Sequence, residues 1–226
     1  MINILLEGCD IHAPWLFDAL KRYLKPSHRV CVIALSFRDA AVKGLDDWNA
    51  LYARERGCYY TGIVESLSAY GIGEEQIEFI NYYFDTPETA IQKILKADIL
   101  YFPGGLPDRM MDRIREMRIY EAILRHRGIV LGYSAGAVIQ LREYHLTADR
   151  DYPSFAYYSG FPFIDDFYLE VHYTGSPEQN ASIQRVLREK RKPVYAAYFM
   201  EGGILVDRGS IELIGRVLRF DPDHAP

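Results

Sequence analysis

The sequence predicts an α/β fold, a doubly wound and mostly parallel sheet with helices on both faces. Residues 29–35 form a continuous apolar run, which is typical of a strand covered by helices on both sides. Residues 14–24 place apolar side chains at Leu16, Leu20 and Leu24, with the period of an amphipathic helix. This alternation of strand and helix continues through the first 140 residues, which favours parallel strands joined by crossover helices.

The first half of the chain supplies most of the regular elements. Its apolar runs predict strands at residues 2–6, 29–35, 76–84, 98–102 and 128–133. Amphipathic stretches between them predict helices at residues 14–24, 46–56, 60–70, 87–96 and 108–126, the last broken near Met117. Thr86 is the expected N-cap of helix 87–96 because its hydroxyl can accept from the first turn, and Pro87 suits a position that needs no N–H donor.

The second half is less regular. Residues 144–164 are rich in aromatic, Asp, Ser, Pro and Gly residues, so we expect a loop with short strands. A strand at 167–173 precedes a helix at 177–191, for which Ser176 is the expected N-cap. Strands at 194–200, 203–207 and 210–220 follow as edge strands, the last two joined by a turn at Arg208-Gly209. No repeat or linker interrupts the pattern, so residues 1–226 are expected to form one domain.

Composition narrows the function classes. The net charge is −5 and no long basic run occurs, which argues against nucleic acid or an anionic membrane as a partner. No apolar stretch approaches the roughly 18 residues that span a bilayer. Cys9, Cys31 and Cys58 show neither metal-ligand spacing nor an even-numbered disulfide framework. We therefore expect a cytoplasmic protein with no metal and no cofactor, and Cys31, within an apolar run, is expected in the core.

The segment Gly132-Tyr133-Ser134-Ala135-Gly136 is a candidate nucleophile turn. It follows an apolar strand and opens an apolar helix, which is the context that a G-x-S-x-G motif requires. Two glycines permit a tight turn that projects Ser134 outward at the carboxyl edge of the sheet, where ligands bind in open α/β sheets. The N–H of Ala135, at the start of the helix, is a candidate oxyanion donor.

A second glycine turn, Pro103-Gly104-Gly105, ends the strand at 98–102. In a parallel sheet this turn lies at the same edge as Ser134, and the missing side chains let the backbone approach a substrate closely. The N–H of Gly105 is therefore the other candidate oxyanion donor.

A catalytic serine needs a base, and the chain has 6 histidines. His172 is preferred because it ends a predicted strand just before Gly175, and His145 is the weaker candidate. His12 and His28 lie near early strands, His126 is expected to act as a cation at a helix end, and His224 lies close to the chain end.

Glu201 is the preferred carboxylate to orient the histidine. It follows the apolar run 195–200 and precedes two glycines, as suits a group held at the rim of the sheet. Glu170, Asp165 and Asp166 are alternatives. Glu170 would share a face with His172 on one strand but could not easily turn back to its imidazole.

At these residues the chain resembles the serine peptidases of the aspartyl dipeptidase (peptidase E) and cyanophycinase family. The resemblance covers most of the chain and is carried by residues 101–105, 132–137, the strand with His172, and residues 195–207. It implies a fold similar to class I glutamine amidotransferases, a flavodoxin-like three-layer sandwich. It also implies a Ser–His–Glu triad in that chain order, here Ser134, His172 and Glu201, with Gly105 and Ala135 forming the oxyanion hole.

The chain departs from the family pattern at two places. Leu106-Pro107 stands where the family usually has Asn or Asp, and Tyr173–Pro177 stands where an Arg-Gly-Arg stretch commonly follows the histidine. The resemblance therefore implies the catalytic machinery of the family, while these two departures leave its preference for aspartyl peptides open.

Together these features predict a serine-type peptidase that hydrolyses a small peptide or isopeptide bond. One alternative is an esterase of the α/β-hydrolase fold, which needs the order Ser, acid, His, with Asp165 or Asp166 before His172, or Asp207 before His224. Another is a non-catalytic amidotransferase-like binding or regulatory protein.

For two further groups of residues, the sequence allows more than one role. Arg109, Arg113 and Arg150 could bind a substrate carboxylate, although solvated surface charges are favoured. The aromatic stretch 152–163 could line a pocket or form the subunit contact of a homodimer.

Overall fold

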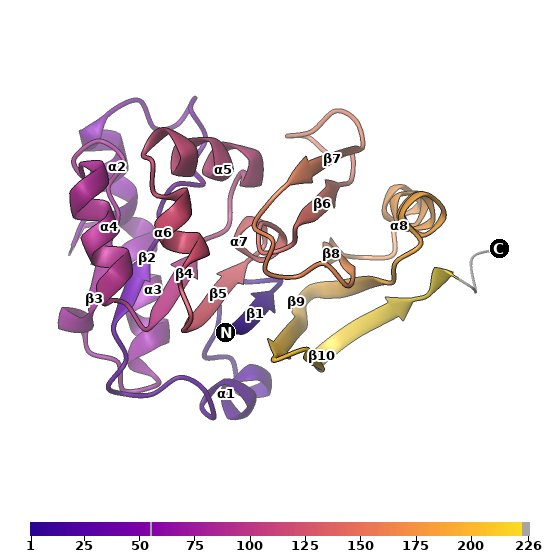
Figure 1. Cartoon of the computed structure of the whole chain (residues 1–226), viewed down its shortest axis with the longest axis horizontal. Helices are drawn as coiled ribbons and strands as arrows, with labels where there is room; N and C mark the ends of the chain where they lie inside the picture. Colours follow the sequence, from indigo (N-terminus) through magenta and orange to yellow (C-terminus); the bar gives the residue numbers. More distant parts are fainter. Residues whose placement is uncertain (55, 223–226) are drawn as a thin grey trace.

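A mixed sheet forms the centre of the molecule (Figure 1). The structure is a computed structural model that describes residues 1–54 and 56–222. In these residues the sheet has the order β10-β9-β1-β5-β4-β2-β3, and β8 also pairs with β9. Its parallel core consists of β1 (Ile2–Leu6), β2 (Val30–Val32), β3 (Ile77–Phe79), β4 (Ile99–Phe102) and β5 (Ile129–Tyr133). Strands β8 (Tyr168–Tyr173), β9 (Val194–Asp207) and β10 (Ser210–Phe220) extend it, with β9 antiparallel to β1 and β10.

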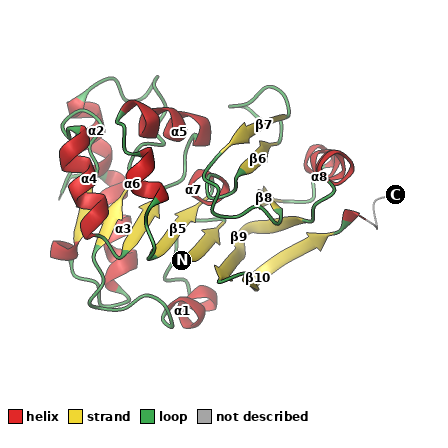
Figure 2. Ribbon diagram, in the orientation of Figure 1, coloured by secondary structure: helices red, strands yellow, loops and turns green. Residues whose placement is uncertain are grey.

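Alternating side chains on these strands supply two hydrophobic cores, one on each face of the sheet. Leu5, Leu100 and Val130 face the first core, and their neighbours Ile4, Ile99 and Leu131 face the second. The first core is covered by α4 (Pro87–Lys96), α5 (Pro107–Glu116), α6 (Tyr120–Leu124) and α7 (Ala135–Val138). The second is covered by α1 (Pro14–Leu20), α2 (Leu45–Tyr52) and α3 (Cys58–Ser68) (Figure 2). The predicted doubly wound α/β fold is thus confirmed.

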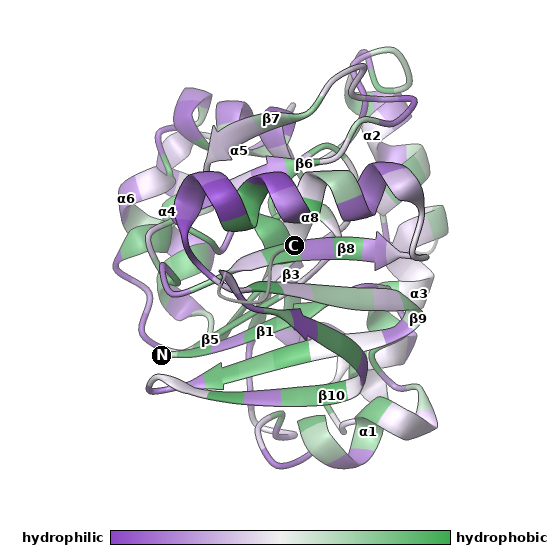
Figure 3. Cartoon of the chain, turned by 90° about the vertical axis from the view of Figure 1, so that its right-hand side faces the viewer, coloured by the Kyte–Doolittle hydropathy of each residue, from purple (hydrophilic) through white to green (hydrophobic). Residues whose placement is uncertain are grey.

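A smaller third core lies under α8 (Pro177–Lys190), which packs on β8 and the first half of β9. Figure 3 shows α8 as a mostly hydrophilic helix in front of more hydrophobic strands. The expected irregular segment forms an antiparallel hairpin of β6 (Glu143–Leu146) and β7 (Ala156–Ser159). Within the described residues, no helix has the length and apolarity to cross a membrane.

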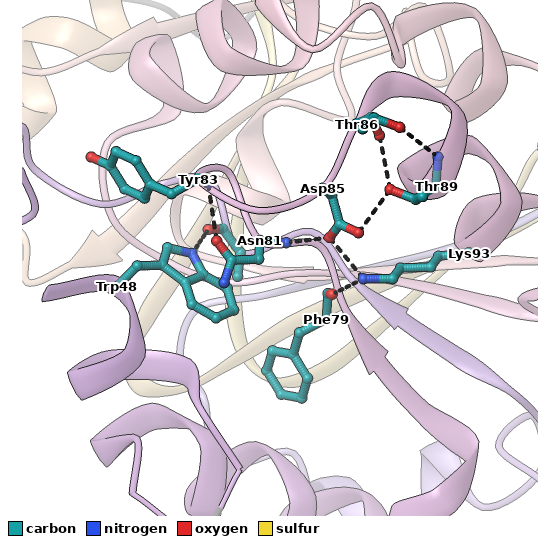
Figure 4. Close-up of polar contacts among 9 residues, drawn as sticks. Trp48, Phe79, Asn81, Tyr83, Asp85, Thr86, Thr89 and Lys93 are labelled. Carbon is teal, nitrogen blue, oxygen red and sulfur yellow. Dashed lines mark hydrogen bonds and ion pairs between the residues drawn. The ribbon is translucent and has the colours of Figure 1, made fainter. Parts of the chain in front are cut away.

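The N-cap residues predicted from the sequence agree with the helix starts in the structure. Thr86 Oγ1 accepts from Thr89 N at 3.3 Å, as predicted for the N-cap of α4, and Ser176 caps α8 in the same way. Just before α4, the buried Asp85 carboxylate accepts from Asn81 N at 2.8 Å, Thr89 Oγ1 at 3.0 Å and Lys93 Nζ at 2.7 Å (Figure 4). These bonds fix the connection from β3 to α4.

The structure corrects several boundaries. The strands expected at 194–200 and 203–207 are joined into one element, β9, which bulges between them: its pairing with β10 passes from Ala197, opposite Val217, to Gly202, opposite Gly215. A glycine suits this close return, because a Cβ at Gly202 would lie 2.8 Å from Ala197 Cα and from Arg216 O. The strands expected at 29–35 and 76–84 are shorter, and the helix expected at 14–24 ends at Leu20. The helix expected at 46–56 ends at Tyr52, and residue 55 lies outside the described residues.

Candidate active site

Ser134 sits on the strand-to-helix turn between β5 and α7. Its backbone has φ 50° and ψ −114°, a conformation that costs energy for a residue with a side chain. The flanking glycines make the turn feasible: a Cβ at Gly132 would lie 2.1 Å from Gly136 O, and one at Gly136 would lie 1.9 Å from Phe102 O. Ser134 N donates to Leu6 O at 2.9 Å, which ties the turn to the end of β1.

His172 reaches Ser134 from β8. Ser134 Oγ lies 2.8 Å from His172 Nε2, within hydrogen-bond distance. The pairing of β8 with β9 shifts register between Glu170 and Tyr173, and His172 adopts φ 55° within this irregularity. The kink turns the imidazole toward the carboxyl end of β5, and its side chain remains 46% exposed.

Glu7 is the carboxylate that contacts His172. It directly follows β1, the neighbour of β5 in the sheet, and its side chain is only 1% exposed. One carboxylate oxygen hydrogen-bonds His172 Nδ1, and the other accepts from Met200 N at 2.5 Å. Ser134, His172 and Glu7 thus form a continuous chain of contacts at one edge of the sheet.

The structure does not bring Glu201 to this chain, which corrects the sequence-based assignment. Because β9 continues through this position, Glu201 lies within the strand and not at its end. At this position β9 bulges away from its pairing with β10, which passes from Ala197 to Gly202. The bulge brings the backbone N–H of Met200 to Glu7, and the Glu201 side chain makes its contact elsewhere. Glu201 is half exposed and pairs with Arg216 at 3.0 Å.

The sequence contained a signal for Glu7. It is a charged residue directly after an apolar parallel strand, and the rule that placed Ser134 and Gly105 at the carboxyl edge applies equally to it. The sequence could not show that β1 pairs directly with β5, which is what brings Glu7 beside the serine turn.

The glycine turn after β4 passes directly beside Ser134. A Cβ at Gly104 would lie 3.3 Å from Ser134 Cβ, and Gly105 has φ 140°. A Cβ at Gly105 would lie 2.3 Å from Ser36 O, so the backbone here approaches the β2 side of the cleft closely. Gly105 and Ala135 both line the cleft that contains Ser134 and His172.

This cleft has a volume of about 910 Å³. Its aromatic lining includes Tyr52, Tyr59, Tyr133, Tyr152 and Phe199. Burial raises the pKa of the Tyr133 phenol, which therefore stays protonated and neutral next to the serine. Of the aromatic stretch 152–163, Tyr152 lines the cleft, whereas Phe161 belongs to the hydrophobic core.

Both departures from the family pattern also border the cleft. Pro107 begins α5 and lines the cleft, and Leu106 N donates to Ser36 O at 2.8 Å. Thr174 and Ser176 line the side of the cleft beyond His172.

The alternative acids and bases lie in other contacts. His145 Nε2 is 2.7 Å from Glu170 Oε2, and both side chains are buried beside the cleft without reaching Ser134. Asp165 pairs with Arg142 and Lys192, which removes it as a partner of His172. No hydrogen bond or ion pair links Asp166 to His172 within the described part of the chain, and His224 lies outside it.

The three arginines considered for a substrate carboxylate have separate environments. Arg113 is buried and donates to Leu35 O and Phe37 O, so it is part of the scaffold. Arg109 pairs with Asp39 away from the cleft lining. Arg150 lines the cleft, is largely exposed, and lies 3.6 Å from Asp151.

The three cysteines are free: Cys31 is buried, as expected, and Cys9 and Cys58 are exposed. Among the described residues, no group of three or more His, Cys, Asp or Glu side chains could hold a metal ion.

A serine on a strained strand-to-helix turn, a histidine at 2.8 Å and a buried carboxylate behind it define the class of serine hydrolases. Within that class, the model of peptidase family S51 matches residues 50–210, and the chain belongs to this family. The protein is therefore a serine-type peptidase, and the predicted relationship to peptidase E is confirmed.

Solved structures show the same fold. A protein from Listeria monocytogenes EGD-e that is assigned as a peptidase E superposes with a TM-score of 0.66 at 17% identity, over 95% of this chain and 98% of that one. A peptidase from an acI-B1 Actinobacterium gives a TM-score of 0.65 at 14% identity, over 97% of this chain and 93% of that one. No curated protein matches the chain significantly.

Proposed function

We propose that Ser134, His172 and Glu7 are the catalytic triad of a peptidase that hydrolyses small peptide or isopeptide bonds through an acyl-enzyme. The observation that carries this proposal is the unbroken line of contacts from Ser134 Oγ through the imidazole to a buried carboxylate. This arrangement uses the residue types of the predicted triad, with Glu7 in place of Glu201.

The geometry supports a two-step reaction. His172 Nε2 takes the proton of Ser134 Oγ as the oxygen attacks the amide carbonyl, and the imidazolium then donates that proton to the leaving amine. Glu7 accepts the Nδ1–H bond, which keeps Nε2 as the proton acceptor and stabilises the imidazolium. The N–H groups of Gly105 and Ala135 are the proposed donors to the tetrahedral oxyanion. Water, deprotonated by the same imidazole, releases the acyl group.

The sequence around the cleft supports a specificity other than that for aspartyl peptides. Leu106-Pro107 and Tyr173–Pro177, which replace the polar and arginine-rich segments typical of the family, both contribute residues to its lining. The three free cysteines support a cytoplasmic location.

Replacing the nucleophile tests the function directly. In a peptide-library assay, Ser134→Ala should lower turnover by at least roughly a thousandfold, because a triad serine supplies the attacking atom. Ser159→Ala, at an exposed position on β7, is the matched control and should retain wild-type turnover. Equal turnover by wild type and Ser134→Ala would remove the proposal.

A further inference from the structure

Two loops that start on opposite sides of the serine meet above the cleft. The loop of residues 147–155 joins β6 to β7, and we call it the roof loop. Its base is anchored on the β8 side of the sheet, because His145 on β6 and Thr147 both hydrogen-bond the buried carboxylate of Glu170 on β8. The second loop follows β2 and carries Arg38.

The strand order places the origins of the two loops on opposite sides of β5, which ends at Ser134. Along the sheet, β2 is separated from β5 by β4, whereas β8 lies beyond β1 and β9 on the other side of β5. Ser134 stands at the carboxyl end of β5. Figure 1 shows the β6–β7 hairpin above this edge of the sheet.

Arg38 and Asp151 make that contact with two hydrogen bonds. Arg38 Nε donates to Asp151 Oδ1 at 3.2 Å and Nη2 donates to Oδ2 at 2.5 Å, and both residues line the cleft. The paired, parallel bonds are the strongest geometry that an arginine and a carboxylate form. The hydrogen bonds from Arg38 lower the pKa of the Asp151 carboxyl, so this carboxyl is charged at neutral pH.

Contacts that do not involve the bridge hold the backbone at both of its ends. On the β2 side, buried Arg113 donates to Leu35 O at 2.6 Å and Phe37 O at 2.8 Å, which fixes the backbone next to Arg38. In the roof loop, Asp149 Oδ1 accepts from the backbone N–H groups of residues 151 and 152 at 2.8 Å each.

A second tie holds the roof loop above α5. Tyr152 OH donates to Asp108 Oδ1 at 2.6 Å. An exposed ion pair usually contributes little because two mobile side chains must be ordered, but here the backbone on both sides of the bridge is held by other contacts.

We propose that the Arg38–Asp151 bridge closes the roof loop over the cleft and limits the substrate to peptides short enough to lie beneath it. The two residues are thereby determinants of substrate length. The inference rests on the proposed peptidase function at Ser134. It assigns to these residues a role that the triad does not require.

A substrate-length series tests the bridge. Peptides from two to eight residues with the same scissile bond are compared on wild type, Arg38→Gln, Asp151→Asn and the charge-exchanged double variant Arg38→Asp/Asp151→Arg. In both single variants, the ratio of kcat/KM for the octapeptide to that for the dipeptide should rise at least about tenfold, and the exchange should restore most of the wild-type ratio.

Arg22→Gln breaks an ion pair of comparable exposure with Glu212, far from the cleft, and should leave the ratio unchanged. An unchanged ratio in both single variants overturns the proposal.

Labelling of Ser134 separates this inference from the proposed function. A small fluorophosphonate should label wild type much faster than the same warhead on a bulky polymer chain, and the two rates should converge in Asp151→Asn. If both probes label wild type equally fast, the inference about the roof loop is wrong, whereas the assignment of Ser134 as the nucleophile is supported. A known serine hydrolase, labelled in parallel, shows that the small probe is reactive. If that control is labelled but neither probe labels wild type, the proposed function is wrong, and the inference about the roof loop is wrong with it.

Discussion

Three residues that build the site have a left-handed backbone although none is glycine. Ser134 has φ 50°, His172 has φ 55° and Met200 has φ 62°. Positive φ also occurs at Arg118, Arg191 and Arg208, but the first two stand at helix C-termini and the third in a hairpin turn, where it is common. The three site residues lie at successive contacts: the hydroxyl, the imidazole, and the N–H that holds the Glu7 carboxylate. Backbone strain therefore accumulates where the reacting groups must be aimed.

Glu7 should be far more important for turnover than Glu201. Glu7→Gln keeps the size of the buried side chain but can present an N–H to His172 Nδ1, which favours the wrong imidazole tautomer. Loss of the equivalent carboxylate in other triads costs about 10⁴ in kcat, so we expect a drop of roughly 10³–10⁴ at neutral pH. The measurement is kcat on the best peptide of the library.

The matched control is Glu201→Gln, which removes a carboxylate from the half-exposed pair with Arg216. This variant should stay within about threefold of wild type, because exposed ion pairs contribute little. The reverse ranking of the two variants would return the orienting role to Glu201.

At the scale of elements, the serine turn depends on two glycines that close packing requires. Gly136→Ala would place a methyl carbon 1.9 Å from Phe102 O at the end of β4, so the turn or the strand must shift. We expect the free energy of unfolding to fall by about 1–3 kcal/mol, the usual cost of overpacking, and turnover to fall with the displaced serine. Urea denaturation of the variant measures this change.

Gly62→Ala is the appropriate comparison for that measurement. Gly62 lies within α3, and a Cβ there would meet nothing within 4 Å. Alanine should therefore stabilise the protein by about 0.4–1 kcal/mol through helix propensity and a less mobile unfolded chain. Equal effects of the two substitutions would show that the serine turn tolerates a side chain.

Elements defined by local patterns were predicted well, and those defined by distant contacts were not. The bounds of α4 and both N-caps at Thr86 and Ser176 agree with the sequence, because a cap is a contact within one turn. The bulge that joins the two halves of β9 was missed, since it is defined by the pairing of Ala197 and Gly202 with distant residues of β10. Similarly, the sequence placed Ser134, His172 and Gly105 at one edge of the sheet, but it left Glu7 unassigned because the pairing of β1 with β5 is a long-range property.

On the scale of the whole molecule, the two edges of the sheet differ in character. The carboxyl edge carries the cleft with Ser134, whereas the opposite edge has a cavity of about 740 Å³ that is lined by Met1, Asp98 and His126 among others. His126 was expected to be a cation at a helix end. Its side chain is buried instead, and burial lowers the pKa of the imidazole. The backbone at Ile129 and Asp98 partly oppose this shift, whereas the nearby charge of Arg127 adds to it.

This buried imidazole should make folding stability depend on pH. The unfolded chain protonates His126 with a pKa near 6.5, whereas the folded protein takes up that proton only at lower pH. Between these two values the unfolded state binds more protons, so the contribution of His126 is fully present above about pH 6.5 and is lost as the pH falls, by up to roughly 1.4 kcal/mol per pH unit. The free energy of unfolding, measured by urea denaturation from about pH 8 to 5, should therefore fall less steeply in His126→Asn than in wild type. His28→Asn leaves this buried imidazole in place and should retain the wild-type slope. Parallel curves for wild type and His126→Asn would show that burial of His126 does not couple folding to protons.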